Sequence, residues 1–148
     1  MKLLLQRVAH ASVEIDGETV GSIGAGFLAL VGCRTGDTPA DADYLADRMV
    51  ALRVFHDDEG RMNRSLLDIG GSALLVSQFT LYADCKKGNR PSFIHAGAPD
   101  EAEALYEYII ERCRENVPVV ETGSFGAEMK ISLVNDGPFT IILDDRDL

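Results

Sequence analysis

The chain has 148 residues, 46% of them hydrophobic and 26% charged, which is ordinary for one soluble globular domain. These proportions exclude an intrinsically disordered chain, a collagen-like repeat and a disulfide-stapled mini-protein, and no apolar run approaches the ~18 residues of a membrane helix. The net charge of −10 argues against an unspecific electrostatic grip on nucleic acid or lipid, so an RNA partner would have to be held at a local basic patch. We therefore expect a single domain over residues 1–148 that is not a membrane protein.

The cysteines indicate the compartment. Cys33, Cys85 and Cys113 are odd in number, far apart and in no CxxC pattern. This pattern argues against a disulfide framework or a thiolate metal site and favours a reducing environment. We expect a cytoplasmic protein that needs neither a metal nor a cofactor.

The first third of the chain is predicted to form strands. Lys2–Ala9 is an apolar strand candidate, and Ala11–Ile15 and Glu18–Ser22 flank Asp16-Gly17. Asp-Gly between alternating runs is the strongest short hairpin signal, because both turn positions need a positive φ. The continuous apolar run Phe27–Gly32 predicts a strand that is buried on both faces.

A helix is predicted to begin at Thr38-Pro39, because threonine caps helices and proline suits the first helical position. Polar Asp57–Arg64 reads as a surface loop. Ser72–Phe79 is a second buried strand, which extends towards Leu81, and Asp84–Pro99 is a long loop. A second helix begins at Asp100, with one apolar face made of Ala102, Leu105, Tyr106, Ile109, Ile110 and Cys113.

Short strands are expected to close the chain, at Val117–Glu121, Met129–Val134 and Phe139–Leu143, with Thr122–Glu128 and Asn135–Pro138 as turns between them. Because strands and helices do not alternate strictly, a doubly wound parallel sheet is disfavoured. The order predicts an α+β fold of mainly antiparallel sheet, with two helices packed outside.

Three hydrogen-bonding side chains, Ser77, Gln78 and Thr80, follow directly on the buried run Ala73–Val76. The residues alone favour an exposed strand end, where polar side chains are expected. The alternative is a site at the end of a strand, where backbone N–H groups and a hydroxyl meet a substrate carbonyl.

Two further segments each allow a plain and a functional interpretation. Asn135-Asp136-Gly137-Pro138 has the composition of a turn, and its Gly-Pro bond can also be cis. Asp84–Asp100 has no acid between its ends but holds the basic residues Lys86, Lys87 and Arg90, together with His95. It is either a solvated loop or an arm that contacts phosphates.

Several motifs together resemble the D-aminoacyl-tRNA deacylase family. They are Gln6-Arg7-Val8, Met62-Asn63-Arg64-Ser65, Ser77–Asp84, Lys87–Phe93, Phe125-Gly126-Ala127-Glu128-Met129 and Asn135–Thr140, and they span nearly the whole chain. Phe139, Cys85 and the Ile94-His95 segment depart from the family's usual pattern.

The resemblance implies a barrel-like fold and a homodimer that hydrolyses the ester of D-aminoacyl-tRNA, and also of mischarged glycyl-tRNA, with active sites at the dimer interface. It implies that Ser77, Gln78, Phe79 and Thr80 line the catalytic pocket, and that Gly137 and Pro138, joined by a cis bond, enter the partner's pocket to reject L-amino acids. Phe125 and Met129 are implied in substrate binding, Arg7 in holding the Gly-Pro carbonyls, and Lys86, Lys87 and Arg90 in tRNA binding.

Three hypotheses follow: an esterase for D-aminoacyl-tRNA, a binding module without turnover, and an editing domain with another amino-acid preference. Thr80 is either a covalent nucleophile or a positioning group. We favour positioning, because no histidine or carboxylate is placed by the sequence to activate the hydroxyl.

Overall fold

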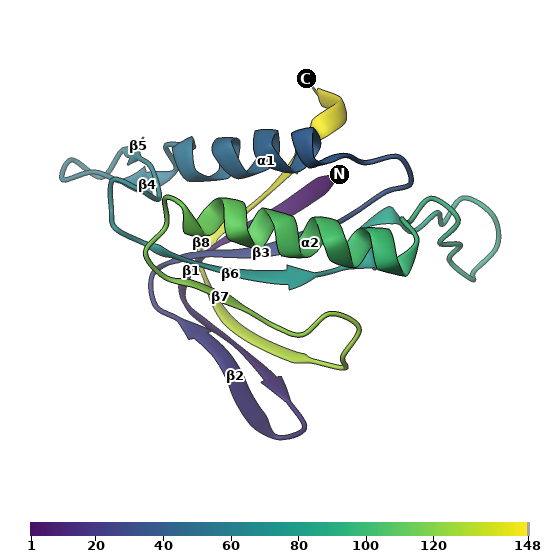
Figure 1. Cartoon of the computed structure of the whole chain (residues 1–148). Helices are drawn as coiled ribbons and strands as arrows, with labels where there is room; N and C mark the ends of the chain where they lie inside the picture. Colours follow the sequence, from purple (N-terminus) through teal and green to yellow (C-terminus); the bar gives the residue numbers. More distant parts are fainter. Residues whose placement is uncertain (148) are drawn as a thin grey trace.

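The computed structural model describes residues 1–147. A curved six-stranded sheet forms the centre of the molecule, and two helices lie on one of its faces (Figure 1). The sheet has the order β2-β1-β3-β6-β7, and β8 pairs with the other edge of β1. Its strands are β1 (Lys2–Ile15), β2 (Glu18–Ile23), β3 (Gly26–Gly32), β6 (Ser72–Ser77), β7 (Val120–Thr122) and β8 (Lys130–Asp144).

Strand β1 bends the sheet into its barrel-like shape. On one edge, residues Lys2–Val8 pair with β3 and Ala11–Ile15 pair with β2, whereas β8 follows the other edge along almost the whole strand. The two strands predicted at Lys2–Ala9 and Ala11–Ile15 are therefore one continuous strand. The predicted hairpin at Asp16-Gly17 is confirmed, with φ of 50° and 80° at the two positions.

The sheet is mixed, so the prediction of a mainly antiparallel sheet holds for most pairs but not for all. All partners of β1 are antiparallel to it, whereas β3 with β6 and β6 with β7 are parallel. Parallel strands are usually buried on both faces, as the apolar run of β3 predicts. The carboxyl ends of β3 and β6 consequently meet at one edge of the sheet.

Helices α1 (Pro39–Ala51) and α2 (Pro99–Arg114) lie side by side on the sheet (Figure 1). The predicted start of α1 is confirmed: the Asp41 carboxylate accepts hydrogen bonds from the backbone N–H and hydroxyl of Thr38, at 2.8 and 3.1 Å. The first residue of α2 is Pro99, one position before the predicted start. Arg112 joins the helices through ion pairs to Asp43 and Asp47.

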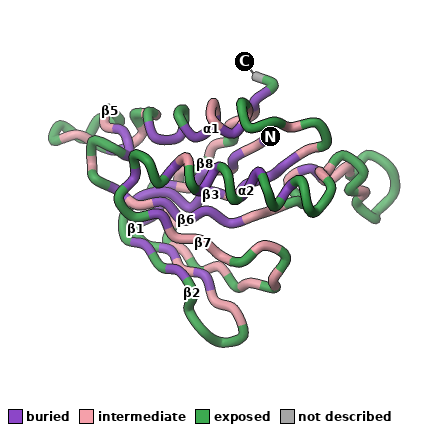
Figure 2. The backbone as a smooth tube through the Cα atoms, in the orientation of Figure 1, coloured by how far each residue is buried: buried purple, intermediate pink, exposed green. Residues whose placement is uncertain are grey.

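The apolar core lies mainly between the helices and the sheet. Figure 2 shows buried backbone along β1, β3 and β6, while the outer sides of both helices are exposed. A smaller cluster on the other face of the sheet includes Leu28 and Leu74. Among the described residues no helix is both long and apolar enough to cross a membrane.

Several local predictions were wrong in type or in bounds. The predicted loop Asp57–Arg64 contains half of a small hairpin, β4 (Phe55–His56) with β5 (Met62–Arg64). The predicted strand Ser72–Phe79 ends at Ser77, and a 3₁₀ turn, η1 (Phe79–Tyr82), replaces its extension. A second 3₁₀ turn, η2 (Asp145–Asp147), follows β8, and the strand predicted at Val117–Glu121 is found at Val120–Thr122.

Candidate active site

An apolar pocket of about 690 Å³ opens at the edge where β3 and β6 end. The start of α2 and the segment from Phe125 to Met129 form its other walls. Its lining is Val31, Cys33, Val76, Ser77, Gln78, Phe79, Phe93, Ala96, Gly97, Ala98, Pro99, Ala102, Phe125, Gly126, Ala127, Met129 and Ile131. The parallel pairing of β3 and β6 is what brings Cys33 and Ser77 to the same end of the sheet.

Most of the predicted pocket residues lie in this one lining. Ser77 is the last residue of β6, Gln78 and Phe79 follow it at the start of η1, and Phe125 and Met129 come from the loop between β7 and β8. Thr80 is exposed and absent from the lining. Its hydroxyl oxygen accepts a short hydrogen bond from the Gln78 side chain, so Thr80 contacts a pocket residue instead of forming the wall.

Two backbone donors stand at the pocket edge. The chain turns from β6 into η1 after Gln78, and the first N–H groups of a helical turn have no partner within the turn. Those of Phe79 and Thr80 donate no hydrogen bond to any described residue, whereas Gln78 N–H is held by Val31 C=O at 2.8 Å. This leaves two adjacent donors available to a carbonyl oxygen.

No histidine or charged side chain appears in the described lining of the pocket. Its one thiol, that of Cys33, is 5% exposed and donates to Ala102 C=O at 3.8 Å. Burial, with the charge of Asp37 adding to it, raises the pKa of Cys33 to about 11. The thiol is therefore protonated at neutral pH and is not a nucleophile.

The segment Asn135–Pro138 is not the turn between two strands that its composition predicts. Strand β8 continues through it: Asn135 pairs with Val8 and Thr140 pairs with Gln6, so Asp136–Phe139 lies opposite Arg7 alone. The extra residues form an excursion from the strand. The Asn135 side chain closes its base, accepting from Phe139 N–H at 2.6 Å and donating to Phe139 C=O at 3.2 Å.

The Gly137–Pro138 bond at the tip of this excursion is cis. Gly137 has a φ of 150°, and a Cβ there would lie 2.7 Å from Phe139 N and 3.1 Å from Arg7 Nη2. Both Gly137 and Pro138 are exposed, and neither lines the apolar pocket of its own chain.

Arg7 holds the excursion in place by hydrogen bonds. Its side chain is buried and donates to Asp136 C=O at 2.8 Å and to Val54 C=O at 2.6 Å. The guanidinium also lies 5.0 Å from the centre of the Phe139 ring. Arg7 therefore holds the carbonyl that precedes the Gly-Pro pair, rather than the carbonyls of the pair itself.

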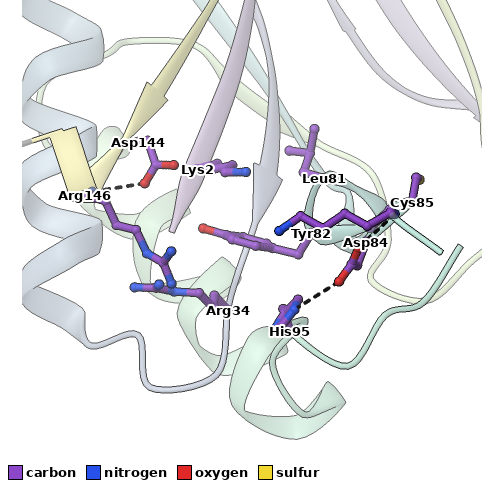
Figure 3. Close-up of a pocket in the computed structure, with 11 residues that line it drawn as sticks. Lys2, Arg34, Leu81, Tyr82, Asp84, Cys85, His95, Asp144 and Arg146 are labelled. Atoms are coloured by element: carbon purple, nitrogen blue, oxygen red, sulfur yellow. Dashed lines mark hydrogen bonds and ion pairs between the residues drawn. The ribbon is translucent and has the colours of Figure 1, made fainter.

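The basic residues of the predicted arm lie on a loop that is closed at its base. Asp84 and Ser92 exchange backbone hydrogen bonds of 2.7 and 2.9 Å, and Lys86, Lys87 and Arg90 are exposed between them. Lys86 also lines a second cavity, which is shown in Figure 3.

Sequence reasoning missed Cys33 and Phe93 as pocket residues. The signal for Cys33 was its place directly after a buried strand, but it is informative only once β3 and β6 are known to be parallel. Phe93 packs edge-on against Phe79, with ring centres 5.0 Å apart. Among described residues with metal-binding atoms, Asp37, Asp41 and Asp145 come together, but Asp37 and Asp145 already pair with the Met1 amino group.

Comparison with known proteins decides the family. A family model described as D-Tyr-tRNA(Tyr) deacylase matches residues 4–144. The chain belongs to the D-Tyr-tRNA(Tyr) deacylase family. It is 58% identical over 148 residues to the D-aminoacyl-tRNA deacylase of Thermomicrobium roseum, covering 100% of this chain and 96% of that one. The enzyme of the same name from Paracidovorax citrulli is 60% identical over 140 residues, covering 95% and 90%.

Solved structures agree with this membership. The structure of a protein named c-Myc DNA Unwinding Element Binding Protein superposes with a TM-score of 0.92 at 37% identity, covering 97% of this chain and 98% of that one. A probable eukaryotic D-amino acid tRNA deacylase, 18% identical, gives a TM-score of 0.81 and shares the fold, covering 96% of this chain and 97% of that one. The family resemblance drawn from the sequence motifs, and the α+β fold with two outer helices, are thereby confirmed.

Proposed function

We propose that the protein is a D-aminoacyl-tRNA deacylase, which hydrolyses the ester between a D-amino acid and the 3′ end of tRNA. The names of its relatives support the substrate class. The observation that carries the proposal is the pair of unengaged N–H groups of Phe79 and Thr80 beside an apolar pocket without charged groups.

These features suit the hydrolysis of an activated ester. Water adds to the carbonyl carbon, the carbonyl oxygen gains negative charge, and the bond to the ribose oxygen then breaks. Two N–H donors aimed at that oxygen stabilise the charge, and each such donor contributes about 10²–10³ to the rate in other enzymes. Because the described lining holds no histidine or carboxylate, the water gives its proton to solvent or to the substrate's own 2′-hydroxyl. The leaving ribose oxygen takes up a proton from solvent or from that same 2′-hydroxyl, so that a neutral ribose diol remains.

Thr80 is assigned a positioning role. Its hydroxyl is engaged by the Gln78 side chain, and no described histidine or carboxylate is hydrogen-bonded to it. A threonine needs a base to become a nucleophile, so a covalent intermediate on Thr80 is disfavoured.

Selectivity for D-amino acids is assigned to Gly137 and Pro138 of a second copy of the chain. The excursion that carries them is fixed by Asn135 and Arg7, is exposed at Gly137 and Pro138, and lies outside its own apolar pocket. Rigid backbone placed close to the substrate Cα leaves room for hydrogen but not for the Cβ of an L-amino acid. Since glycine has no Cβ, glycyl-tRNA is also a substrate.

The tRNA is held at its acceptor end by Lys86, Lys87 and Arg90. Together they form the basic island of a chain with net charge −10. The free cysteines of the protein support a cytoplasmic location.

A deacylation assay with D-tyrosyl-, glycyl- and L-tyrosyl-tRNA tests the proposal. We expect turnover of the first two and none of the third. Binding without turnover of any ester would identify a binding module, and hydrolysis of the L-ester would refute the assigned selectivity. Light scattering should give twice the monomer mass of 16.1 kDa, whereas a stable monomer at micromolar concentration would remove the second copy from the site.

A further inference from the structure

A second cavity, of about 530 Å³, lies where β1 begins and where β3 and β8 end (Figure 3). We call it the charged cavity. Its cationic lining residues come from segments far apart in the sequence: Lys2 from β1, Arg34 from the end of β3, Lys86 from the basic loop and Arg146 from η2. Tyr82, on η1, lies between them.

Two buried donors in this cavity, the hydroxyl of Tyr82 and Nε of Arg34, form no hydrogen bond with a described residue. Arg34 Nε also lies 3.8 Å from a carboxylate oxygen of Asp37, within ion-pair distance. Tyr82 is 8% exposed, and in Figure 3 its hydroxyl points into the space between Lys2, Arg34 and Arg146. A buried polar group without a partner is costly, so such a group commonly indicates a ligand or ordered water.

The hydroxyl of Tyr82 stays protonated. Burial, supported by the nearby carboxylates of Asp37, Asp144 and Asp145, raises its pKa above the ordinary tyrosine value. The group is therefore a hydrogen-bond donor at every physiological pH. Lys2 Nζ lies 4.7 Å from the ring centre, next to that donor.

The two acids that line the cavity, Asp84 and Asp144, each accept a hydrogen bond. Asp84 accepts from Lys86 N–H at 3.0 Å and lies 3.5 Å from His95, and Asp144 accepts from Arg146 N–H at 3.0 Å. Asp37 pairs with Arg34 and with the Met1 amino group. By contrast, the side chains of Lys2, Lys86 and Arg146 form no ion pair with a described carboxylate.

The charged cavity and the apolar pocket share their walls. Cys33 lines the pocket and the next residue, Arg34, lines the cavity; on η1 Phe79 faces the pocket, and Leu81 and Tyr82 face the cavity. In the segment after the basic loop, Phe93 and Ala96 line the pocket while His95 lines the cavity. The two cavities are therefore neighbours, and an RNA strand with its 3′ end in the pocket has its next phosphates on the side of the charged cavity only if it crosses this shared wall.

We infer that the charged cavity binds a backbone phosphate of the tRNA acceptor strand, with Tyr82 and Arg34 as hydrogen-bond donors and Lys2 and Arg146 as counter-charges. This rests on the proposed function, and it extends the RNA contact beyond the basic loop. A free phosphate or a nucleotide has the same chemistry, so the test separates these sources.

Binding of uncharged tRNA to the full chain is the main test, because it does not depend on catalysis. In Lys2→Gln/Arg146→Gln we expect about tenfold weaker binding at 0.1 M salt, and a slope of log K against log [salt] reduced by about one unit. The matched control is Arg61→Gln/Arg114→Gln, which removes the same charge at exposed positions away from the cavity. The control should bind tRNA within twofold of the parent.

Equal losses in the two double variants would mean that only overall charge matters, and no loss in either would mean that the cavity does not meet RNA; both overturn the inference. AMP and inorganic phosphate are titrated in parallel. One outcome is that AMP or phosphate binds the parent but not the cavity variant, while both proteins bind tRNA equally well. The site then belongs to a small phosphate ligand and not to RNA. If the parent binds tRNA as expected but fails to deacylate it, the proposed function fails and the inference stands.

Tyr82→Phe removes one hydroxyl and nothing else. A donor to phosphate should cost about three- to tenfold in tRNA affinity when it is removed. The melting temperature without RNA should not fall, because the hydroxyl has no partner in the described structure to lose. Tyr108→Phe, which removes an exposed hydroxyl bonded to Asp43, should leave tRNA binding unchanged. A lower melting temperature with unchanged RNA affinity would make the Tyr82 hydroxyl structural and refute its assigned role.

Discussion

The apolar pocket and the charged cavity are neighbours with opposite chemistry. The pocket is lined by side chains without charge and has backbone N–H groups at its edge, while the cavity gathers lysine and arginine side chains around a buried hydroxyl. Both are built from the end of β3, from η1 and from the segment that leads into α2.

This difference suits two parts of one substrate, the ester that reacts and the RNA strand that is bound. An ester that is already activated needs position and a stabilised oxyanion, which backbone N–H groups beside an uncharged pocket supply. A polyanion needs counter-charges, which work best where they are not already paired. In a chain of net −10, gathering Lys2, Arg34, Lys86 and Arg146 at one cavity keeps the attraction for a polyanion local.

We expect the largest loss of activity from a variant that removes one backbone N–H donor at the pocket. Phe79→Pro deletes the Phe79 N–H, and proline is tolerated at the first position of a helical turn. We expect kcat for D-aminoacyl-tRNA to fall about 10²–10³-fold with little change in tRNA affinity.

Phe79→Ala is the matched control, since it loses the ring but keeps the N–H. Single-turnover kinetics on both variants separates the two contributions. Equal kcat values for the proline and alanine variants would show that the N–H is not part of the chemistry.

The next largest effect is expected on stability, when the hydrogen bonds of Arg7 to the Gly-Pro excursion are removed. Arg7→Met leaves the carbonyls of Asp136 and Val54 without their donor, at a cost of about 1 kcal/mol for each part-buried hydrogen bond that is lost. Urea unfolding measures this loss of stability. Arg61→Met, at an exposed position, should change stability by less than about 0.5 kcal/mol. Unchanged stability in Arg7→Met would mean that water replaces the guanidinium and that the excursion does not depend on it.

The sequence predicted the pocket better than the sheet around it. The apolar periodicity located both helices, and Ser77, Gln78 and Phe79 of the predicted site lie where the apolar pocket opens. The parallel pairing of β3 and β6 was not predicted, although continuous apolar runs are typical of parallel strands, because such a run does not say which strand it pairs with. Cys33 and Arg34, which depend on that pairing, were therefore missed.

Turn composition misled for a related reason. Asn135-Asp136-Gly137-Pro138 has the residues of a turn, but the chain on both sides pairs with the same strand, β1. An excursion differs from a turn here by its long-range contact with Arg7. The local composition carries no information about that contact. Likewise, the basic loop was visible as a cluster in the sequence, whereas Lys2, Arg34 and Arg146 become a cluster through folding.

Salt should weaken binding at the charged cavity and leave the reaction in the apolar pocket unchanged. Between about 0.05 and 0.3 M salt, KM for D-aminoacyl-tRNA should rise at least about tenfold, because released counterions oppose phosphate binding. The rate constant kcat should stay within about twofold, since the pocket lining is uncharged. D-aminoacyl-adenosine, which has no phosphate, should show neither change. A kcat that falls with salt while KM is constant would place charge in the chemical step.

The smallest expected effect is that of thiol chemistry on the pocket. Cys33 lines it, but burial raises the pKa of this thiol to about 11, and that of Cys113 in the core to about 12. At pH 8 only about one Cys33 in a thousand would be a thiolate, the form that alkylating agents attack. Iodoacetamide should therefore modify exposed Cys85 alone and leave turnover unchanged, as mass spectrometry and the deacylation assay can show together. Cys85→Ser should then take up no label and keep full activity. If activity instead fell in step with modification of Cys33, the pocket would contain a reactive thiolate, and catalysis by backbone donors alone would be the wrong description of it.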